Sequence, residues 1–205
     1  MLEVLTGTGL AASAGLNAYI PLLTMGLLAR HTDLIDLPSG WQWLGNGWVI
    51  GILAVLLVIE VVADKVPVVD HVNDVVQTVV RPTAGGLAFG AGSASETVTV
   101  SDPGNFFSSN DWVPVATGVL IALGVHLLKS AARPVINATT AGAGAPVAST
   151  AEDATSVLMS VVAILLPVLV LAFLLGLVLF LFWFLRRRSD RRRERQAARA
   201  AGFRV

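Results

Sequence analysis

Charged side chains lie within or directly beside two strongly apolar segments of this 205-residue chain, where they could carry chemistry. Glu60 lies inside one apolar run, and Asp64 follows on the same helical face one turn later. His126, Lys129 and Arg133 are spaced so that they share one face of a second helix. Ionisable groups at membrane depth are costly and by default indicate a functional pathway. The two faces therefore predict a proton or ion relay or, as the simpler alternative, a salt-bridge network that fixes helix packing.

Two asparagines lie where a helix is expected to be interrupted. Asn17 stands in a segment rich in small residues near Pro21, and Asn137 stands in a similar segment near Pro134. An amide side chain both donates and accepts hydrogen bonds, so it can coordinate a solute or cap the end of a broken helix. We expect the two asparagines to flank a site near the membrane midplane, with hydrogen bonding between helices as the alternative.

Three further residues could belong to such a pathway, which Glu60, Asp64, His126, Lys129 and Arg133 would gate on the cytoplasmic side. Glu152 and Asp153 precede the last apolar segment, where they could attract cations at an outer mouth or simply offset the helix dipole. Lys65 could line the pathway, or its aliphatic stem could run along apolar surface so that the ammonium reaches water. His126 is the residue best suited to pass protons, because its usual pKa is about 6.5.

The composition excludes several classes of protein. Hydrophobic residues make up 55% of the chain and charged residues only 14%, whereas an ordinary soluble domain has about a quarter charged residues. Disordered chains are poor in apolar residues, so disorder is excluded as well. The chain has no Cys, and therefore no disulfide, thiolate metal site or Cys nucleophile. No phosphate loop, HExxH or nucleophile-elbow motif is present, so we expect no enzymatic activity, metal or cofactor.

Apolar segments long enough to cross a bilayer define the elements that must position these residues. A spanning helix needs about 20 apolar residues. Residues 48–63, 112–128 and 154–185 qualify, and 5–29 is a weaker, uncharged candidate. The last segment is too long for one straight crossing, and Pro167 is expected to kink or break it. We expect these segments to form an all-α membrane domain.

The net charge of zero conceals an asymmetry that predicts the orientation. Residues 186–205 hold nine Arg and two acids and carry +7, while residues 1–185 carry −7. Basic residues stay on the cytoplasmic side, so the tail should be cytoplasmic, and the connections 31–47 and 101–111, which lack Lys and Arg, should face outward. Anionic lipid explains the tail better than nucleic acid does. The other basic positions expected on the cytoplasmic side are Lys65, Arg81, Lys129 and Arg133.

This orientation requires the chain to return outward twice in segments that are only weakly hydrophobic. The candidates are 84–98 and 135–150, which are rich in Gly, Ala and Ser. Such segments are tolerated inside a bundle because small residues permit close helix contact. We therefore predict about six membrane segments with both termini cytoplasmic. Re-entrant half-helices at these two segments are the alternative.

Two stretches of the chain resemble each other and indicate an internal repeat. Residues 48–65 and 112–129 both run from a Trp to a Lys, and each is followed by an Arg-Pro pair and a small-residue stretch. The predicted units are about 5–65 and 81–129. Repeats built around interrupted helices are typical of transporters, whose broken segments meet near the midplane.

Residues 66–80 have valines on one helical face and polar residues on another. This pattern predicts an amphipathic cytoplasmic helix that packs on protein, since it lacks the Lys and Arg that grip anionic lipid. Asp70, Asp74 and the following Arg81 are therefore expected to be structural residues at the cytoplasmic face.

Three stretches together resemble a family of bacterial membrane proteins catalogued as domain of unknown function 4126. They are GLNAYIPLL at 15–23, IEVVADKVPVVDHVNDVVQTVVRPTAG at 59–85 and HLLKSAARPVIN at 126–137. The pair Glu152-Asp153 after Ser149, followed by Pro167, also fits. The resemblance implies a polytopic integral membrane protein and brings no activity with it. The positions that it shares with the residues chosen above are Asn17, Glu60, Asp64, Lys65, Asp70, Asp74, Arg81, Lys129, Arg133, Asn137, Glu152 and Asp153.

These observations favour a small transporter or channel for an ion or small solute in the bacterial inner membrane. We expect residues 1–185 to form the transmembrane domain, residues 186–205 to form a basic cytoplasmic tail, and the chain to form a homo-oligomer. The alternative is a scaffold or assembly protein that transports nothing, in which the intramembrane polar residues only lock the helices together. Lipid handling or intramembrane catalysis ranks last, because no nucleophile and base converge in the sequence.

Overall fold

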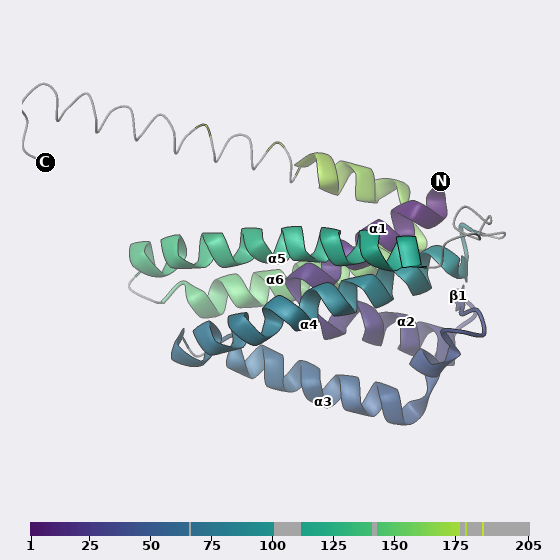
Figure 1. Cartoon of the computed structure of the whole chain (residues 1–205), viewed down its shortest axis with the longest axis horizontal. Helices are drawn as coiled ribbons and strands as arrows, with labels where there is room; N and C mark the ends of the chain where they lie inside the picture. The colour runs from purple at the N-terminus through teal and green to yellow at the C-terminus, as the bar shows by residue number, and fades with distance from the viewer. Residues whose placement is uncertain (66, 101–111, 141–142, 177–178, 180–185, 187–205) are drawn as a thin grey trace, which may run out of the picture. The chain divides into compact units, whose positions relative to one another are not determined.

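The computed structural model describes residues 1–65, 67–100, 112–140, 143–176, 179 and 186, except for the side chains of 67–72. The chain divides into two units, Met1–Val170 and Leu171–Val205, and each is described by itself. In the first unit, helices lie side by side along one axis (Figure 1). The elements are α1 (Leu2–Leu16), α2 (Tyr19–His31), β1 (Ile35–Asp36), η1 (Gln42–Gly45), α3 (Gly47–Ala63), α4 (Pro67–Ala94), β2 (Glu96–Thr97), α5 (Trp112–Thr140) and α6 (Ala145–Leu165).

The small residues of α1 place it at the centre of the first unit, where it packs against α4, α5 and α6. Its residues from Gly9 to Gly15 are all buried. A Cβ added at Gly9 would lie 2.6 Å from the Cβ of Ala163, and one added at Gly15 would lie 2.6 Å from the Cβ of Val125. Glycine at these positions therefore allows α6 and α5 to approach the backbone of α1 closely.

The chain reverses direction at Asn17, so residues 5–29 do not form a single crossing. Asn17 is extended, with φ −144° and ψ 123°, and it ends α1 after 15 residues. Its side-chain Oδ1 accepts hydrogen bonds from the backbone N–H groups of Tyr19 (3.1 Å) and Ile20 (3.3 Å). This is an N-cap for α2, which then runs back toward the end where α1 began (Figure 1). At 1.5 Å per residue, α1 and α2 are each about 20 Å long, which is shorter than a bilayer core of about 30 Å.

Helix α4 joins two segments that the sequence pattern separated. The predicted amphipathic helix at 66–80 and the predicted crossing at 84–98 belong to one helix of 28 residues, with Pro82 inside it. A proline removes one backbone hydrogen bond and usually breaks a helix. Here the small-residue half beyond Pro82 is buried against α1 and α5, and this packing keeps the helix continuous.

The segment 135–150 does not cross either, because it is divided between two helices. Its first part completes α5, and its last part begins α6 after Gly144, with Pro146 in the first turn. The prediction at Pro167 is confirmed: α6 ends at Leu165, Leu166 leaves helical geometry at φ −141° and ψ 60°, and helical conformation resumes at Val168. A fold built of helices is also confirmed, while six crossings and an internal repeat are not.

Two short strands tie the α2–α3 connection to the end of α4. Strands β1 and β2 pair antiparallel, with Ile35 opposite Thr97 and Asp36 opposite Glu96. Both strands lie at the end of the first unit that also holds the N-terminus (Figure 1). This end therefore carries the acidic connection that was expected to face outward.

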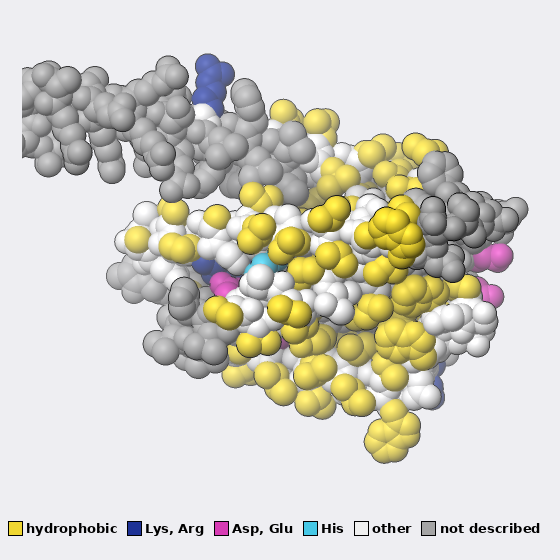
Figure 2. Space-filling model, in the orientation of Figure 1, with side chains coloured by type: hydrophobic (Ala, Val, Ile, Leu, Met, Phe, Trp, Pro, Cys, Tyr) yellow, Lys and Arg dark blue, Asp and Glu magenta, His cyan; other side chains and the backbone are white. Residues whose placement is uncertain are grey.

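Many large apolar side chains point outward from the helices, while others, such as Leu10, Met25 and Phe89, are buried between them. On α3, Trp48 is 85% exposed, and Val55 and Val58 are 60% and 63% exposed. Hydrophobic side chains spread over much of the face drawn in Figure 2. Helices α5 and α6 are long and apolar enough to cross a membrane, and α3 is a shorter apolar helix. These features are compatible with a helix bundle that has lipid around it.

Candidate functional site

Eight charged side chains meet where α1 gives way to α2. They come from the end of α3, the middle of α4, the second half of α5 and the first turns of α6. The acidic and basic faces predicted from the sequence therefore pair inside the bundle. We refer to this set as the ionic network, and its members are Glu60, Asp64, Lys65, Arg81, Lys129, Arg133, Glu152 and Asp153.

Asp64 is the centre of the network. It is 1% exposed, and its Oδ2 lies 2.9 Å from Lys129 Nζ and 3.4 Å from both Arg81 Nη2 and Arg133 Nη2. Its other oxygen accepts a hydrogen bond of 2.8 Å from Asn73 Nδ2. Burial alone would raise the pKa of Asp64, but the charges of Lys129 and Arg81 outweigh burial and hold this pKa below its usual value.

Glu60 lies deeper in the bundle and uses only one of its oxygens. Its Oε1 accepts hydrogen bonds from Arg81 Nη2 at 2.8 Å and Arg81 Nε at 3.2 Å. Its Oε2 is buried and has no hydrogen-bond partner among the described residues. Gln77, one turn before Arg81 on α4, is 3% exposed, and its Oε1 is likewise buried without a hydrogen-bond partner among the described residues. Arg81 links the two residues, because it lies one turn after Gln77 on α4 and binds Glu60 Oε1.

His126 is held in one neutral form by its two neighbours. Arg81 Nη1 lies 3.3 Å from His126 Nδ1, and arginine can only donate, so Nδ1 must be the acceptor. The ring proton is then on Nε2, which lies 3.1 Å from Thr78 Oγ1. Thr78 Oγ1 in turn donates to the carbonyl of Asp74 at 2.8 Å. Protonating Nδ1 would break its bond to Arg81, so this geometry favours a positioning role for His126 over the predicted proton relay.

The helix break itself is part of the network. Lys129 Nζ donates to the carbonyl oxygen of Leu16 at 3.2 Å, where the last turn of α1 exposes its carbonyls. Asn17 Nδ2 donates to Asp153 Oδ1 at 2.9 Å, while the Asn17 oxygen caps α2. Asp153 also lies 3.9 Å from Lys65 Nζ. The network therefore satisfies both helix ends that the break exposes.

Glu152 closes the network on the side of α6. Its Oε2 lies 2.6 Å from Arg133 Nη2 and 3.0 Å from Lys129 Nζ. With Glu60, Asp64 and Asp153, it gives four carboxylates against the two arginines and two lysines of the set. The fully ionised network is therefore neutral, which is the condition under which buried charges are tolerated.

A serine cluster, formed by Ser13, Ser156 and Ser160, continues the polar interior along α1 and α6. Ser13 Oγ lies 2.7 Å from both Ser156 Oγ and Ser160 Oγ, and it donates to the carbonyl of Ser156 at 2.8 Å. All three residues are buried. Sequence reasoning missed this cluster, although Ser13 lies one turn before Asn17 and Ser156 one turn before Ser160. The same spacing argument that selected the charged faces would have placed each pair on one face.

Some predicted residues lie outside the network. Asn137 is one turn beyond Arg133 inside α5, and its buried Oδ1 has no hydrogen-bond partner among the described residues, so the hydrogen bonds that hold Asn17 at a helix break have no counterpart at this oxygen. The Oδ1 of Asp74 is in the same condition, and the side chain of Asp70 lies outside the described residues. Arg81 does not lie at the cytoplasmic surface, where it was expected as a structural residue: it is 0% exposed inside the network, because α4 continues through it into the bundle.

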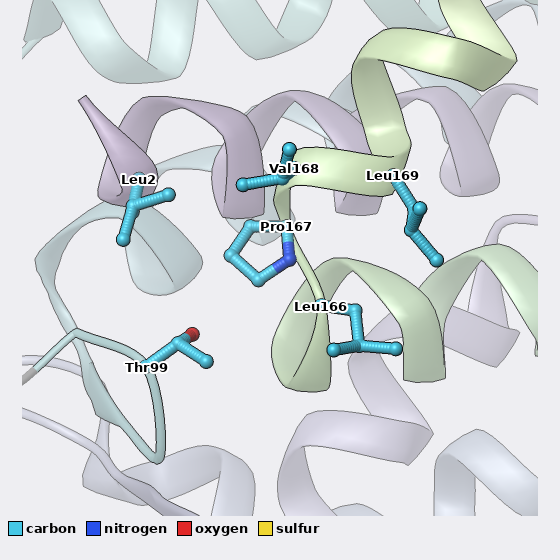
Figure 3. Close-up of a pocket in the computed structure, with 6 residues that line it drawn as sticks. All are labelled: Leu2, Thr99, Leu166, Pro167, Val168 and Leu169. Carbon is cyan, nitrogen blue, oxygen red and sulfur yellow. The ribbon is translucent and has the colours of Figure 1, made fainter.

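An apolar pocket of about 260 Å³ lies away from the network, at the far end of α6. Leu2, Thr99 and residues 166–169 line it, as Figure 3 shows. Apart from Thr99, its lining side chains are apolar and surround the Pro167 break, so it has no charged group that could fix the orientation of a polar ligand. We therefore place the candidate site at the ionic network.

Residues 4–187 match the domain of unknown function 4126 (DUF4126) family, and the chain belongs to that family. The match covers every residue of the network and the serine cluster. No curated protein and no solved structure matches the chain.

Proposed function

We propose that this protein is a small membrane transporter or channel that passes an ion or a small solute through the interior of its helix bundle. The observation that carries the proposal is the ionic network around the α1–α2 break, together with the buried Glu60 and Gln77 oxygens that have no hydrogen-bond partner among the described residues. Interrupted helices that bring backbone ends and polar side chains into the membrane interior are typical of transporter sites.

The break provides the part that can move. Asn17 is joined to α6 through Asp153, and Leu16 is joined to α5 through Lys129. Both links hold the end of α1, and the break separates its backbone ladder from that of α2, so a change in the angle between α1 and α2 would leave the hydrogen bonds inside either helix intact. We propose that such a movement opens the site, and that the Lys65–Asp153 pair, whose side chains are 38% and 17% exposed, closes it toward the cytoplasm.

The reversal at Asn17 changes the topology that we propose. Helices α1 and α2 would enter and leave on one side as a re-entrant pair, and α3 to α6 would cross four times. Much of the predicted last crossing, including 180–185, lies outside the described residues. The N-terminus would then lie on the outer side, opposite the cytoplasmic side that the charge of the tail predicts. This arrangement uses the acidic β1–β2 end as the outer face.

Flux measurements in proteoliposomes test the proposal. Asn17→Ala removes both the cap of α2 and the link to Asp153, so flux should change strongly. The matched control is Asn46→Ala, which also removes an N-cap, that of α3, but lies outside the network. Glu60→Gln should likewise change flux, whereas Glu96→Gln at the exposed strand β2 should not. Wild-type flux no greater than that of empty liposomes, across protons, ions and small solutes, would refute transport.

One observation favours the alternative of a scaffold. Asp64 already accepts hydrogen bonds from four side chains, so at this position the network is saturated, as expected of a structural lock. A scaffold predicts that the same substitutions lower the thermal stability of the protein in detergent without any associated flux. It also predicts co-purification with a stable partner.

A further inference from the structure

We infer that the species bound beside the α1–α2 break is a small uncharged molecule that donates hydrogen bonds, in the class of urea and glycerol. The inference rests on the proposed function and names the substrate class of the same site. Three features of the site lead to it: the charge balance of the ionic network, the acceptor character of its unpartnered groups, and the neutrality of the serine cluster.

Charge balance argues against an ion as the guest. Each carboxylate of the network lies within 4 Å of a lysine or arginine, and the numbers of acids and bases are equal. An added cation or anion would leave one unit of charge uncompensated in an interior where Glu60 and Arg81 are 1% and 0% exposed. Burying an unpaired charge is far more costly than burying a neutral hydrogen-bonding group.

The buried side-chain oxygens without a partner are hydrogen-bond acceptors, so a molecule bound beside them must donate hydrogen bonds. The Oε2 of Glu60 is a carboxylate oxygen and the Oε1 of Gln77 is an amide oxygen, and both can only accept. Leaving a buried acceptor unsatisfied is unfavourable, so a guest with two N–H or O–H groups is stabilised there.

The serine cluster extends the uncharged, hydrogen-bonding part of the interior along the bundle. From Asn17 toward the start of α1, the polar side chains between α1 and α6 are the hydroxyls of Ser13, Ser156 and Ser160. Hydroxyls can exchange hydrogen bonds with an uncharged solute one at a time, since each both donates and accepts. No charged group joins this cluster among the described residues, so an ion would cross it without a counter-charge.

The test measures the permeability of proteoliposomes that hold the full-length protein. Stopped-flow light scattering follows urea and glycerol, and entrapped dyes follow potassium and protons. We expect urea or glycerol permeability above that of empty liposomes, with no added potassium or proton flux. Gln77→Met removes the amide oxygen at similar volume and should lower the solute permeability about fivefold, as expected for one neutral hydrogen bond. Gln42→Met, the same change at an exposed residue of η1, should leave it unchanged.

Potassium or proton flux without urea or glycerol flux would overturn the inference while leaving transport intact. Solute flux that is the same in wild type and Gln77→Met would overturn the site. The absence of any flux above empty liposomes would overturn the proposed function, and the inference would fall with it.

Discussion

Replacing Asp64 by Asn tests whether the network is a set of buried, mutually dependent charges. The change keeps the shape of the side chain and removes its charge. Three cationic groups now face Asp64 Oδ2, with Lys129 at 2.9 Å and Arg81 and Arg133 at 3.4 Å. After the change, the network would hold one positive charge more than its carboxylates compensate.

The expected loss in the free energy of unfolding depends on which carboxylate partners the three basic side chains keep after the change. Arg81 keeps Glu60 at 2.8 Å, and both Arg133 and Lys129 keep Glu152, at 2.6 Å and 3.0 Å. Removing one partner of a buried ion pair costs about 3–5 kcal/mol. Because every base keeps a second carboxylate, we expect a loss near the lower end, about 3 kcal/mol of the free energy of unfolding.

A second substitution separates lost charge balance from lost contacts. Combining Asp64→Asn with Lys129→Met restores neutrality, and pairs of buried charges replaced together are often tolerated. The double variant should recover at least about 1 kcal/mol relative to Asp64→Asn alone, as a positive coupling energy in the double-mutant cycle. Asp36→Asn, at an exposed residue of β1, is the control and should change stability by less than about 0.5 kcal/mol.

The assay is equilibrium unfolding of the purified protein in micelles, followed by tryptophan fluorescence during titration with a denaturing detergent. A loss below about 1 kcal/mol for Asp64→Asn would place the site in the range of exposed salt bridges and refute the burial argument. A double variant no more stable than Asp64→Asn would show that contacts, rather than charge balance, determine the cost.

Three further predictions concern pH, packing and the caps. The pKa of Asp64 is lower in the folded protein than in the unfolded chain, so the stabilisation that its charge provides is complete above about pH 3.9 and is lost as pH falls through the folded value. The difference in the free energy of unfolding between wild type and Asp64→Asn should therefore shrink as the pH is lowered. Gly9→Val would overpack the contact between α1 and α6 and should cost about 1–3 kcal/mol or more in unfolding titrations, whereas Gly51→Ala, with nothing within 4 Å, should stabilise α3 by a few tenths to about 1 kcal/mol. Asn17→Ala and Asn46→Ala should each cost about 1 kcal/mol for a lost cap, with a larger loss for Asn17 because Asp153 also loses its donor. Equal losses for the two asparagines would contradict the role of the Asp153 contact.

The charged residues could be found from the sequence because the helical period places them on common faces. Glu60 and Asp64 on one helix, and His126, Lys129 and Arg133 on another, are local patterns, and the structure brings the two faces together as predicted. The pattern could not supply the partner of Glu60. Arg81 follows a segment that is amphipathic by composition, and only the burial of the small-residue half of α4 draws it into the bundle.

The break at Asn17 shows where local patterns stop being sufficient. Small residues and Pro21 predicted an interruption, and the Asn side chain was expected to cap a broken end or coordinate a solute. The direction of the chain after the break depends on α1 packing between α4, α5 and α6, which are contacts distant in sequence. Asn137 was expected to lie at a helix interruption like that of Asn17, but α5 runs past Pro134 without a break.

The charge asymmetry of the chain is consistent with a neutral interior. The ionic network contributes no net charge, so the whole −7 of residues 1–185 belongs to residues outside it. Asp33, Asp36 and Glu96 are exposed and cluster around the β1–β2 end, while the excess of arginine lies in the tail. Under the proposed topology, surface charge sets the orientation, and the interior charges serve packing or passage. A bundle that keeps eight charged side chains neutral at a helix break is suited to a guest that brings no charge of its own.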